Sequence, residues 1–292
     1  MNRRNFIRTA FGTSLALSQS GSLLAAPALG SYVANIGLQV YTLRDLIAKD
    51  AAGTMKQVAE AGFKQVELYG FPNADPMIKG ATDAGLKISS SHFDSECVLN
   101  PSDEGYSDFM KIVEKAKETG LSHLVVPYLG DGYRKTADDW KKTADRLNKA
   151  AAKSRAAGIQ LAYHNHNFEF IPMDDGTTGY DIFMKEFSPD MMFEVDLFWV
   201  KVAGLDPVTL LKKLNGRVSQ LHLKDLKDGI KTPEFGGVPG DAFKEVGNGV
   251  MNWEAILKIA NTIGVKNCHV EQDQSPDPIA SIRESIAYLQ KL

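Results

Sequence analysis

Runs of β-forming residues alternate with amphipathic helical stretches from residue 36 to the end of the chain. The runs are short, as the strands of a parallel sheet usually are. We expect eight strands, at residues 36–41, 65–69, 87–93, 123–126, 159–166, 192–196, 218–224 and 267–271. Between them, apolar residues recur at helical spacing, as at Phe109, Ile112, Val113 and Ala116.

Local signals mark where the helices between the strands begin. The pairs Asp75-Pro76, Asp206-Pro207 and Asp277-Pro278 each combine a capping carboxylate with a proline suited to the first helical position. We therefore expect the aspartate of each pair to be the N-cap of a helix. Glycines at the expected helix ends allow a left-handed C-cap before the next strand.

Eight strand–helix units in about 260 residues match an α/β protein with a (β/α)8 barrel, the TIM barrel fold. The alternative is an open doubly wound sheet, but Tyr41-Thr42-Leu43-Arg44-Asp45 follows the first strand in place of a glycine-rich phosphate turn. No shift in composition indicates a second domain, so we expect one barrel domain over residues 31–292. The Gly- and Pro-rich segment 225–252 is expected to form a loop over the active face.

The first 30 residues have a different character. Arg3, Arg4 and Arg8 precede a mildly apolar run that ends in Ala26-Pro27-Ala28. This pattern predicts a signal peptide over residues 1–30, and the paired arginines resemble a twin-arginine export signal that delivers a protein to the periplasm. A disordered or amphipathic N-terminal helix is the alternative. No other stretch approaches the roughly 20 apolar residues of a membrane span.

Charge and cysteine content exclude several classes of protein. The 292 residues include 33 Lys and Arg against 36 Asp and Glu, and their net charge is −3. Without the three leader arginines the charge is −6, so no basic excess supports nucleic-acid binding. Two cysteines exclude a disulfide scaffold and a thiolate-rich metal site.

Ionisable residues occupy one face of the expected strands. Alternate residues of a strand share a face, and the face opposite the apolar one holds these residues: Glu67, His164, His166, Glu194, Asp196, His222, Lys224, His269 and Glu271. This face points into a barrel, where unpaired charges are costly unless they bind a partner or a metal. Because barrel enzymes place their active sites at the C-terminal ends of the strands, the pattern predicts such a site.

Four of these residues suit a metal. His164, Asp196, His222 and Glu271 come from four strands and mix imidazole nitrogen with carboxylate oxygen. Such a set favours one divalent ion (Mn, Co, Zn, Fe or Mg) over calcium, with positions open for a substrate. Each residue alone would be an ordinary hydrogen-bonding side chain. Lys224 either holds a substrate oxygen or forms a salt bridge with Glu194 or Glu271.

Ordered short motifs resemble the xylose-isomerase-like TIM barrels, a superfamily of sugar isomerases, epimerases, inosose dehydratases and endonuclease IV-type enzymes. The resemblance spans residues 36–290, and its motifs are the segments 36–43, 61–68, 163–170, 194–196 and 221–225. It implies one divalent ion held by an acid on the fifth strand and by Asp196, His222 and Glu271. Here His164 occupies the place of that acid. Epimerases of the family use two carboxylates, so Glu169 would have to supply the second.

The resemblance implies a metal-dependent isomerase or epimerase that removes a proton beside the carbonyl of a small sugar or keto-sugar. Glu271, Glu169 and Lys224 are the expected proton-transfer residues, and His92, His166, Trp199 and Tyr41 the expected substrate contacts. Alternatives are a 3-keto-glycoside lyase or hydrolase, an inosose-type dehydratase, and a non-catalytic periplasmic sugar-binding protein. A homodimer is expected from the barrel type. An endonuclease is disfavoured because Trp199 replaces a metal-binding histidine, and a cupin because the chain is helix-rich.

Overall fold

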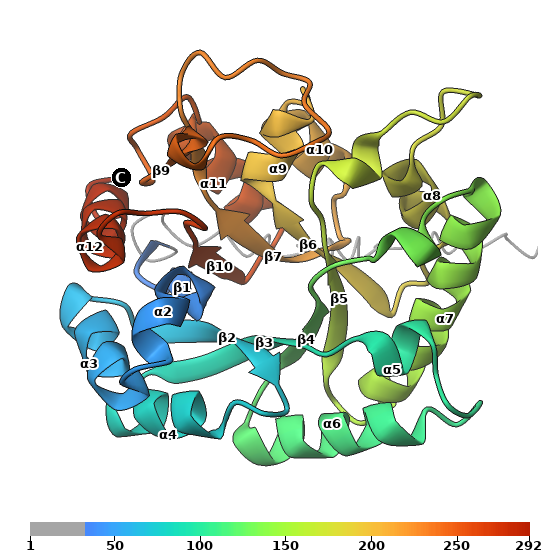
Figure 1. Cartoon of the computed structure of the whole chain (residues 1–292), viewed down its shortest axis with the longest axis horizontal. Coiled ribbons are helices and arrows are strands. Elements are labelled where there is room, and N and C mark those ends of the chain that lie inside the picture. The colour runs from blue at the N-terminus through green and yellow to red at the C-terminus, as the bar shows by residue number, and fades with distance from the viewer. Residues whose placement is uncertain (1–32) are drawn as a thin grey trace, which may run out of the picture.

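The eight expected strands close into a parallel barrel in the computed structural model, which describes residues 33–292 (Figure 1). Neighbouring strands follow the order β1-β10-β7-β6-β5-β4-β3-β2. The strands are β1 (Gly37–Gln39), β2 (Gln65–Phe71), β3 (Lys87–Phe93), β4 (His123–Val126), β5 (Gln160–His164), β6 (Met191–Asp196), β7 (Val218–Leu223) and β10 (Asn267–Val270). The (β/α)8 prediction is confirmed, and the closed sheet excludes the doubly wound alternative.

Helices surround the barrel and cover its apolar outer face (Figure 1). The longer ones are α3 (Ala51–Ala61), α4 (Asp75–Asp83), α6 (Ser107–Thr119), α7 (Ala137–Ala156), α8 (Gly179–Glu186), α10 (Pro207–Lys213), α11 (Trp253–Thr262) and α12 (Pro278–Leu289). Short helices α2 (Arg44–Ile47), α5 (Glu96–Leu99) and α9 (Leu197–Val202) follow strands β1, β3 and β6. The stripe that the sequence predicts on α6 is fully buried. Burial of such stripes against the strands is the main source of stability.

Two of the three predicted aspartate caps form. Asp206 and Asp277 are the N-caps of α10 and α12, and each side chain accepts a backbone hydrogen bond. The third prediction is wrong, because α4 starts one residue earlier, after Ala74. Asp75 is then the first helical residue, and its carboxylate lies 2.6 Å from the ammonium group of Lys115 instead.

The segment 225–252 contains more regular structure than the sequence indicates. Its first two residues, β8 (Asp225–Leu226), pair with β9 (Phe243–Lys244) in a small antiparallel sheet. Phe243 packs with Phe198, Val202, Leu226 and Ala242 in a second, smaller hydrophobic cluster. The segment is therefore anchored beside α9, at the C-terminal end of the barrel.

Strand register brings the inward-facing polar residues together. In the strand register, His164 on β5 pairs with Glu194 on β6, and Asp196 on β6 pairs with His222 on β7. Residues that are level in parallel strands point to the same face, so these pairs meet inside the barrel. The predicted signal peptide, residues 1–30, lies outside the described residues. Within residues 33–292, no helix combines the length and apolarity that a membrane crossing requires.

Candidate active site

A cavity of about 580 Å³ opens at the C-terminal ends of the strands. Its lining includes six of the residues that the sequence predicts for the site: Tyr41, His92, His164, His166, Lys224 and Glu271. Asp196 and His222 are fully buried directly behind Lys224 and Glu271. Trp199 and Glu169 do not line the cavity. The structure thus brings eight of the ten predicted residues to one place.

The four predicted metal ligands lie together. The Nε2 atom of His164 is 3.7 Å from Oδ2 of Asp196. The Nδ1 atom of His222 is 2.8 Å from Oε2 of Glu271 and 3.9 Å from Oδ2 of Asp196. Asp196, His222 and Glu271 therefore offer ligand atoms at one place, and His164 approaches this place through Asp196.

The donor atoms of this cluster fit a divalent ion. Oδ2 of Asp196, Nδ1 of His222 and Oε2 of Glu271 are buried and lie within 4.8 Å of one another, and their close partners are one another and the Lys224 ammonium group. Mixed imidazole and carboxylate donors are those of transition-metal sites. These three residues, with His164, could hold such an ion.

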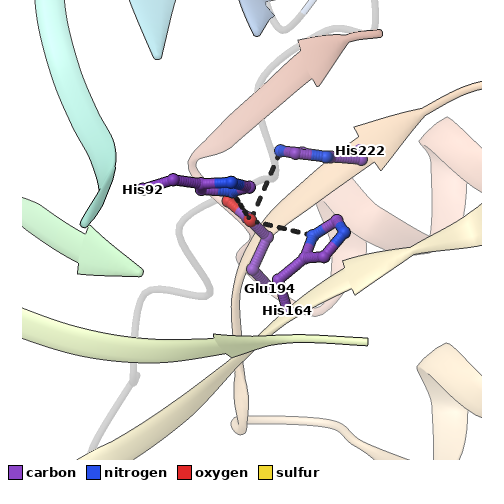
Figure 2. A group of neighbouring side chains, drawn as sticks. All are labelled: His92, His164, Glu194 and His222. Atoms are coloured by element: carbon purple, nitrogen blue, oxygen red, sulfur yellow. Dashed lines mark hydrogen bonds and ion pairs between the residues drawn. The ribbon is translucent and has the colours of Figure 1, made fainter. Parts of the chain in front are cut away.

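Two carboxylates deeper in the barrel orient the histidines. The Nε2 atom of His222 lies 2.6 Å from Oε1 of Glu67, on the ring edge opposite Glu271. The Nδ1 atom of His164 lies 3.1 Å from Oε2 of Glu194, and Nε2 of His92 lies 2.9 Å from the same oxygen (Figure 2). A carboxylate that holds one ring nitrogen leaves the other free to face a metal.

The sequence placed Glu67 and Glu194 on the inward face, and it gave Glu194 only the role of a possible salt-bridge partner of Lys224. The available signal was their position in the strands, since alternate residues of a strand share a face. Gln39 donates to Oε1 of Glu67 at 2.8 Å, and Gln220 donates to Oε1 of Glu194 at 2.8 Å. Both glutamates are fully buried, so these hydrogen bonds replace the water that the carboxylates lose on folding.

The cluster is strongly charged. Burial acts to raise the pKa of Glu194, but His222, His164 and His92 outweigh it and hold the pKa well below its usual range. Burial acts to lower the pKa of His222, but Glu194 and Glu271 outweigh it and raise the pKa well above the ordinary value. Glu194 therefore retains its negative charge, because the positive charge of His222 and the hydrogen bonds from the three histidines outweigh burial.

Lys224 is the one lysine among the residues that line this cavity. Its ammonium group lies 2.7 Å from Oε2 of Glu271, 2.9 Å from Oδ2 of Asp196 and 3.1 Å from Oδ1 of Asp273. The salt bridge that the sequence offered with Glu271 is therefore present, and the one with Glu194 is replaced by Asp196 and Asp273. Burial raises the pKa of Asp273 to about 6, although Lys224 opposes the shift.

Asp273 was missed by the sequence analysis. It lies two residues beyond Glu271, just past the end of β10, and lines the cavity. A carboxylic acid with a pKa near neutrality can both take and return a proton. The last strand was expected to end at Glu271, so Asp273 was not considered. The one available signal was that Asp273, two residues further on, would point to the same side as Glu271 if the chain stayed extended.

Glu169 lies behind the cavity wall. Its Oε1 atom accepts a hydrogen bond of 2.7 Å from the Tyr163 hydroxyl, and its Oε2 atom accepts one of 2.9 Å from the backbone N–H of His166. Burial raises the pKa of Glu169 to about 7. Both oxygens are occupied, so the side chain positions the segment that carries His166 and is not placed to touch a substrate.

Aromatic rings flank the mouth of the cavity. The Tyr41 and Tyr128 side chains are 41% and 48% exposed, unusual values for such large apolar groups. The Tyr128 ring meets the His166 ring edge to face, with centroids 5.3 Å apart. Phe243 from β9 also lines the cavity. Rings of this kind can stack on the apolar face of a sugar.

Comparisons with known proteins agree with this architecture. The family model described as "Xylose isomerase-like TIM barrel" matches residues 55–292. An inosose dehydratase of Clostridium botulinum (strain Alaska E43 / Type E3) is 26% identical over 247 residues, covering 76% of this chain and 82% of that protein.

Solved structures share the barrel fold. A sugar phosphate isomerase/epimerase from Parabacteroides distasonis superposes with a TM-score of 0.72 at 28% identity, covering 87% of this chain and 93% of that one. The IOLI protein with a binding zinc atom superposes with a TM-score of 0.63 at 14% identity, covering 88% of this chain and 95% of that one. The second likeness concerns the fold alone.

Proposed function

The chain belongs to the xylose isomerase-like TIM barrel family, and from that premise we propose that it is a sugar-converting enzyme that removes a proton beside a carbonyl group. The observation that carries the proposal is the cluster of Asp196, His222 and Glu271 beneath a cavity of sugar size. Its three ligand atoms converge on one buried place, and titratable groups of perturbed pKa surround it.

We propose that one divalent ion is held by His164, Asp196, His222 and Glu271. When bound, the ion supplies Lewis-acid activation of the sugar carbonyl. Charge supports its presence, because three carboxylates, those of Asp196, Glu271 and Asp273, share the single ammonium group of Lys224. A divalent cation offsets part of this excess.

The proton-transfer groups lie on two sides of the barrel ring. Lys224 and Asp273 follow β7 and β10, which are neighbours in the barrel. His92 belongs to β3, which is opposite β7 in the strand order. A base on one side and a donor on the other is the arrangement that β-elimination from a keto-sugar needs. Asp273 takes the α-proton, and a histidine delivers a proton to the leaving oxygen.

Elimination is therefore the reaction that we favour. The dehydratase relatives support it, since a dehydratase removes water by such a step. Isomerisation or epimerisation is the second candidate, and a specific residue favours it. Asp94 follows β3 and lines the cavity. With Asp273, it would supply carboxylates on both sides of a ketose.

The charged groups of the cavity favour an unphosphorylated sugar. Arg44 donates hydrogen bonds to the backbone carbonyls of Asp273 and Tyr41 at 2.9 and 3.2 Å. Lys224 is held by three carboxylates. The arginine and the lysine that line the cavity are thus engaged with groups of the protein, and a phosphate would meet Asp94 and Asp273 instead.

Incubation with ketoses and 3-keto-glucosides in deuterated water tests the proposal. Solvent deuterium at the α-carbon without loss of a group supports isomerisation or epimerisation, and release of water or an aglycone supports elimination. Tight binding without exchange would contradict both and support a sugar-binding protein. The variant Asp196→Asn is expected to lose bound metal and turnover. The matched control is Asp138→Asn, whose carboxylate lies on the exposed first turn of α7.

We propose that residues 1–30 direct export by the twin-arginine route. Arg3 and Arg4 with the mild apolar run that follows support this proposal. A fusion of residues 1–30 to a reporter is expected to reach the periplasm, and Arg3→Lys combined with Arg4→Lys is expected to block it. Export that survives the double substitution would contradict this route.

A further inference from the structure

A second cavity lies at the opposite, N-terminal end of the barrel. Its volume is about 640 Å³, similar to that of the site described above. Six strands contribute their first residue to its lining: Gln65, Lys87, His123, Gln160, Val218 and Asn267. The cavity is therefore centred on the barrel axis and separated from the sugar site by the layers of side chains inside the barrel.

The charged residues that line this cavity are all basic. Lys64, Lys87, Arg155 and Lys266 line it, and no Asp or Glu does. This is unusual in a chain that has more acidic than basic residues. The cations come from separate parts of the chain, before β2, at the start of β3, in α7 and before β10. Only the fold brings them together.

None of the four cations has an acidic partner within residues 33–292, where the ion pairs of other lysines are found. Residues 1–32 contain no Asp or Glu. The four side chains are exposed, and like charges gathered around one cavity create a positive potential that attracts an anion. Fold stability alone does not account for this cluster.

The remaining lining favours a polar ligand. Gln65, Gln160 and Asn267 add amide groups, and Met192 and Val218 are the apolar side chains of appreciable size. The volume matches that of sites for small molecules. A ligand with several anionic oxygens fits these features better than an aromatic or hydrophobic one.

We propose that the N-terminal end of the barrel binds a small polyanion that carries two or more phosphate or carboxylate groups. The ligand lies between the four cations and is held by charge-assisted hydrogen bonds. This cavity and the sugar site share no lining residue, so the proposal does not depend on the reaction proposed for the other end of the barrel.

Calorimetric titration with pyrophosphate and with citrate tests the proposal and separates the two sources of anionic groups. One-to-one binding of at least one probe is expected, weakening as salt rises because screening reduces the attraction. In the double variant Lys87→Glu, Lys266→Glu the affinity is expected to fall at least tenfold. The control is Lys117→Glu, Lys258→Glu, which makes the same change in net charge at exposed positions of α6 and α11.

Two results would overturn the proposal. One is that neither pyrophosphate nor citrate binds saturably to the wild-type protein. The other is binding that survives in Lys87→Glu, Lys266→Glu or falls equally in the control. Because both probes can also chelate a metal, the titration is repeated with Asp196→Asn, and binding there is expected to equal that of the wild type.

Discussion

His222 lies between two carboxylates, with Nε2 2.6 Å from Oε1 of Glu67. The other ring nitrogen, Nδ1, faces Glu271 and Asp196. When the ring is neutral, as a metal ligand must be, Glu67 favours the proton on Nε2. A carboxylate at Nε2 keeps the proton there and leaves the Nδ1 lone pair for a metal.

Replacement of this carboxylate should weaken metal binding without removing a ligand. In Glu67→Gln, the amide holds the His222 ring less firmly, so we expect about 10- to 100-fold lower metal affinity. Metal titration followed by calorimetry measures the change. Glu60→Gln on the exposed side of α3 is the control. Unchanged affinity in Glu67→Gln would show that the ring is held by its other contacts.

Metal binding should depend on pH through His222. The pKa of His222 is raised because Glu194 and Glu271 outweigh the effect of burial. A metal ligand must be the neutral imidazole, so the ion has to displace the Nδ1 proton. Affinity is expected to rise with pH by up to about tenfold per unit while His222 is protonated in the metal-free protein. Titrations at pH 6, 7 and 8 measure the slope, and a flat profile would contradict the assignment.

Glu169 should make the fold less stable as pH rises. Its pKa is about 7 in the folded protein, against an ordinary 4.5, because burial favours the neutral acid. Between these two values the folded state holds a proton that the unfolded chain has lost, so the free energy of unfolding falls with pH. The loss amounts to about 3 kcal/mol in total.

The variant Glu169→Gln removes this titration and keeps a neutral side chain. Its free energy of unfolding should therefore fall less between pH 5 and pH 8 than that of the wild type, as urea denaturation at both pH values would show. Exchange of the substrate α-proton should persist, since Glu169 does not reach the cavity. Complete loss of exchange in a folded Glu169→Gln would restore the sequence-based prediction of a proton-transfer role.

Tyr128 should contribute to substrate binding more than to turnover. Its ring is 48% exposed at the cavity mouth. In Tyr128→Ala we expect KM to rise about fivefold, equivalent to about 1 kcal/mol of stacking, with kcat within twofold of the wild type. Tyr128→Phe keeps the ring and should retain the wild-type KM. A fall in kcat as large as the rise in KM would place Tyr128 in the chemical step.

The alternation of apolar and polar residues determined the barrel and the inward-facing residues. Strand parity depends only on the chain geometry of a strand, so His164, Asp196, His222 and Glu271 were identifiable from the sequence. Their common position followed from the fold class, because the strands of a barrel end at one rim.

The tertiary structure alone decided which of these residues meet and how. The roles of Glu67 and Glu194 depend on distances across the barrel, and those distances follow from strand register, which no local pattern specifies. Asp273 acquires its environment from Lys224, 49 residues away. Hydrogen bonds from the Tyr163 hydroxyl and the His166 backbone N–H hold Glu169 outside the cavity. The cations at the N-terminal end come from separate strands, helices and loops, and only closure of the sheet gathers them around one cavity.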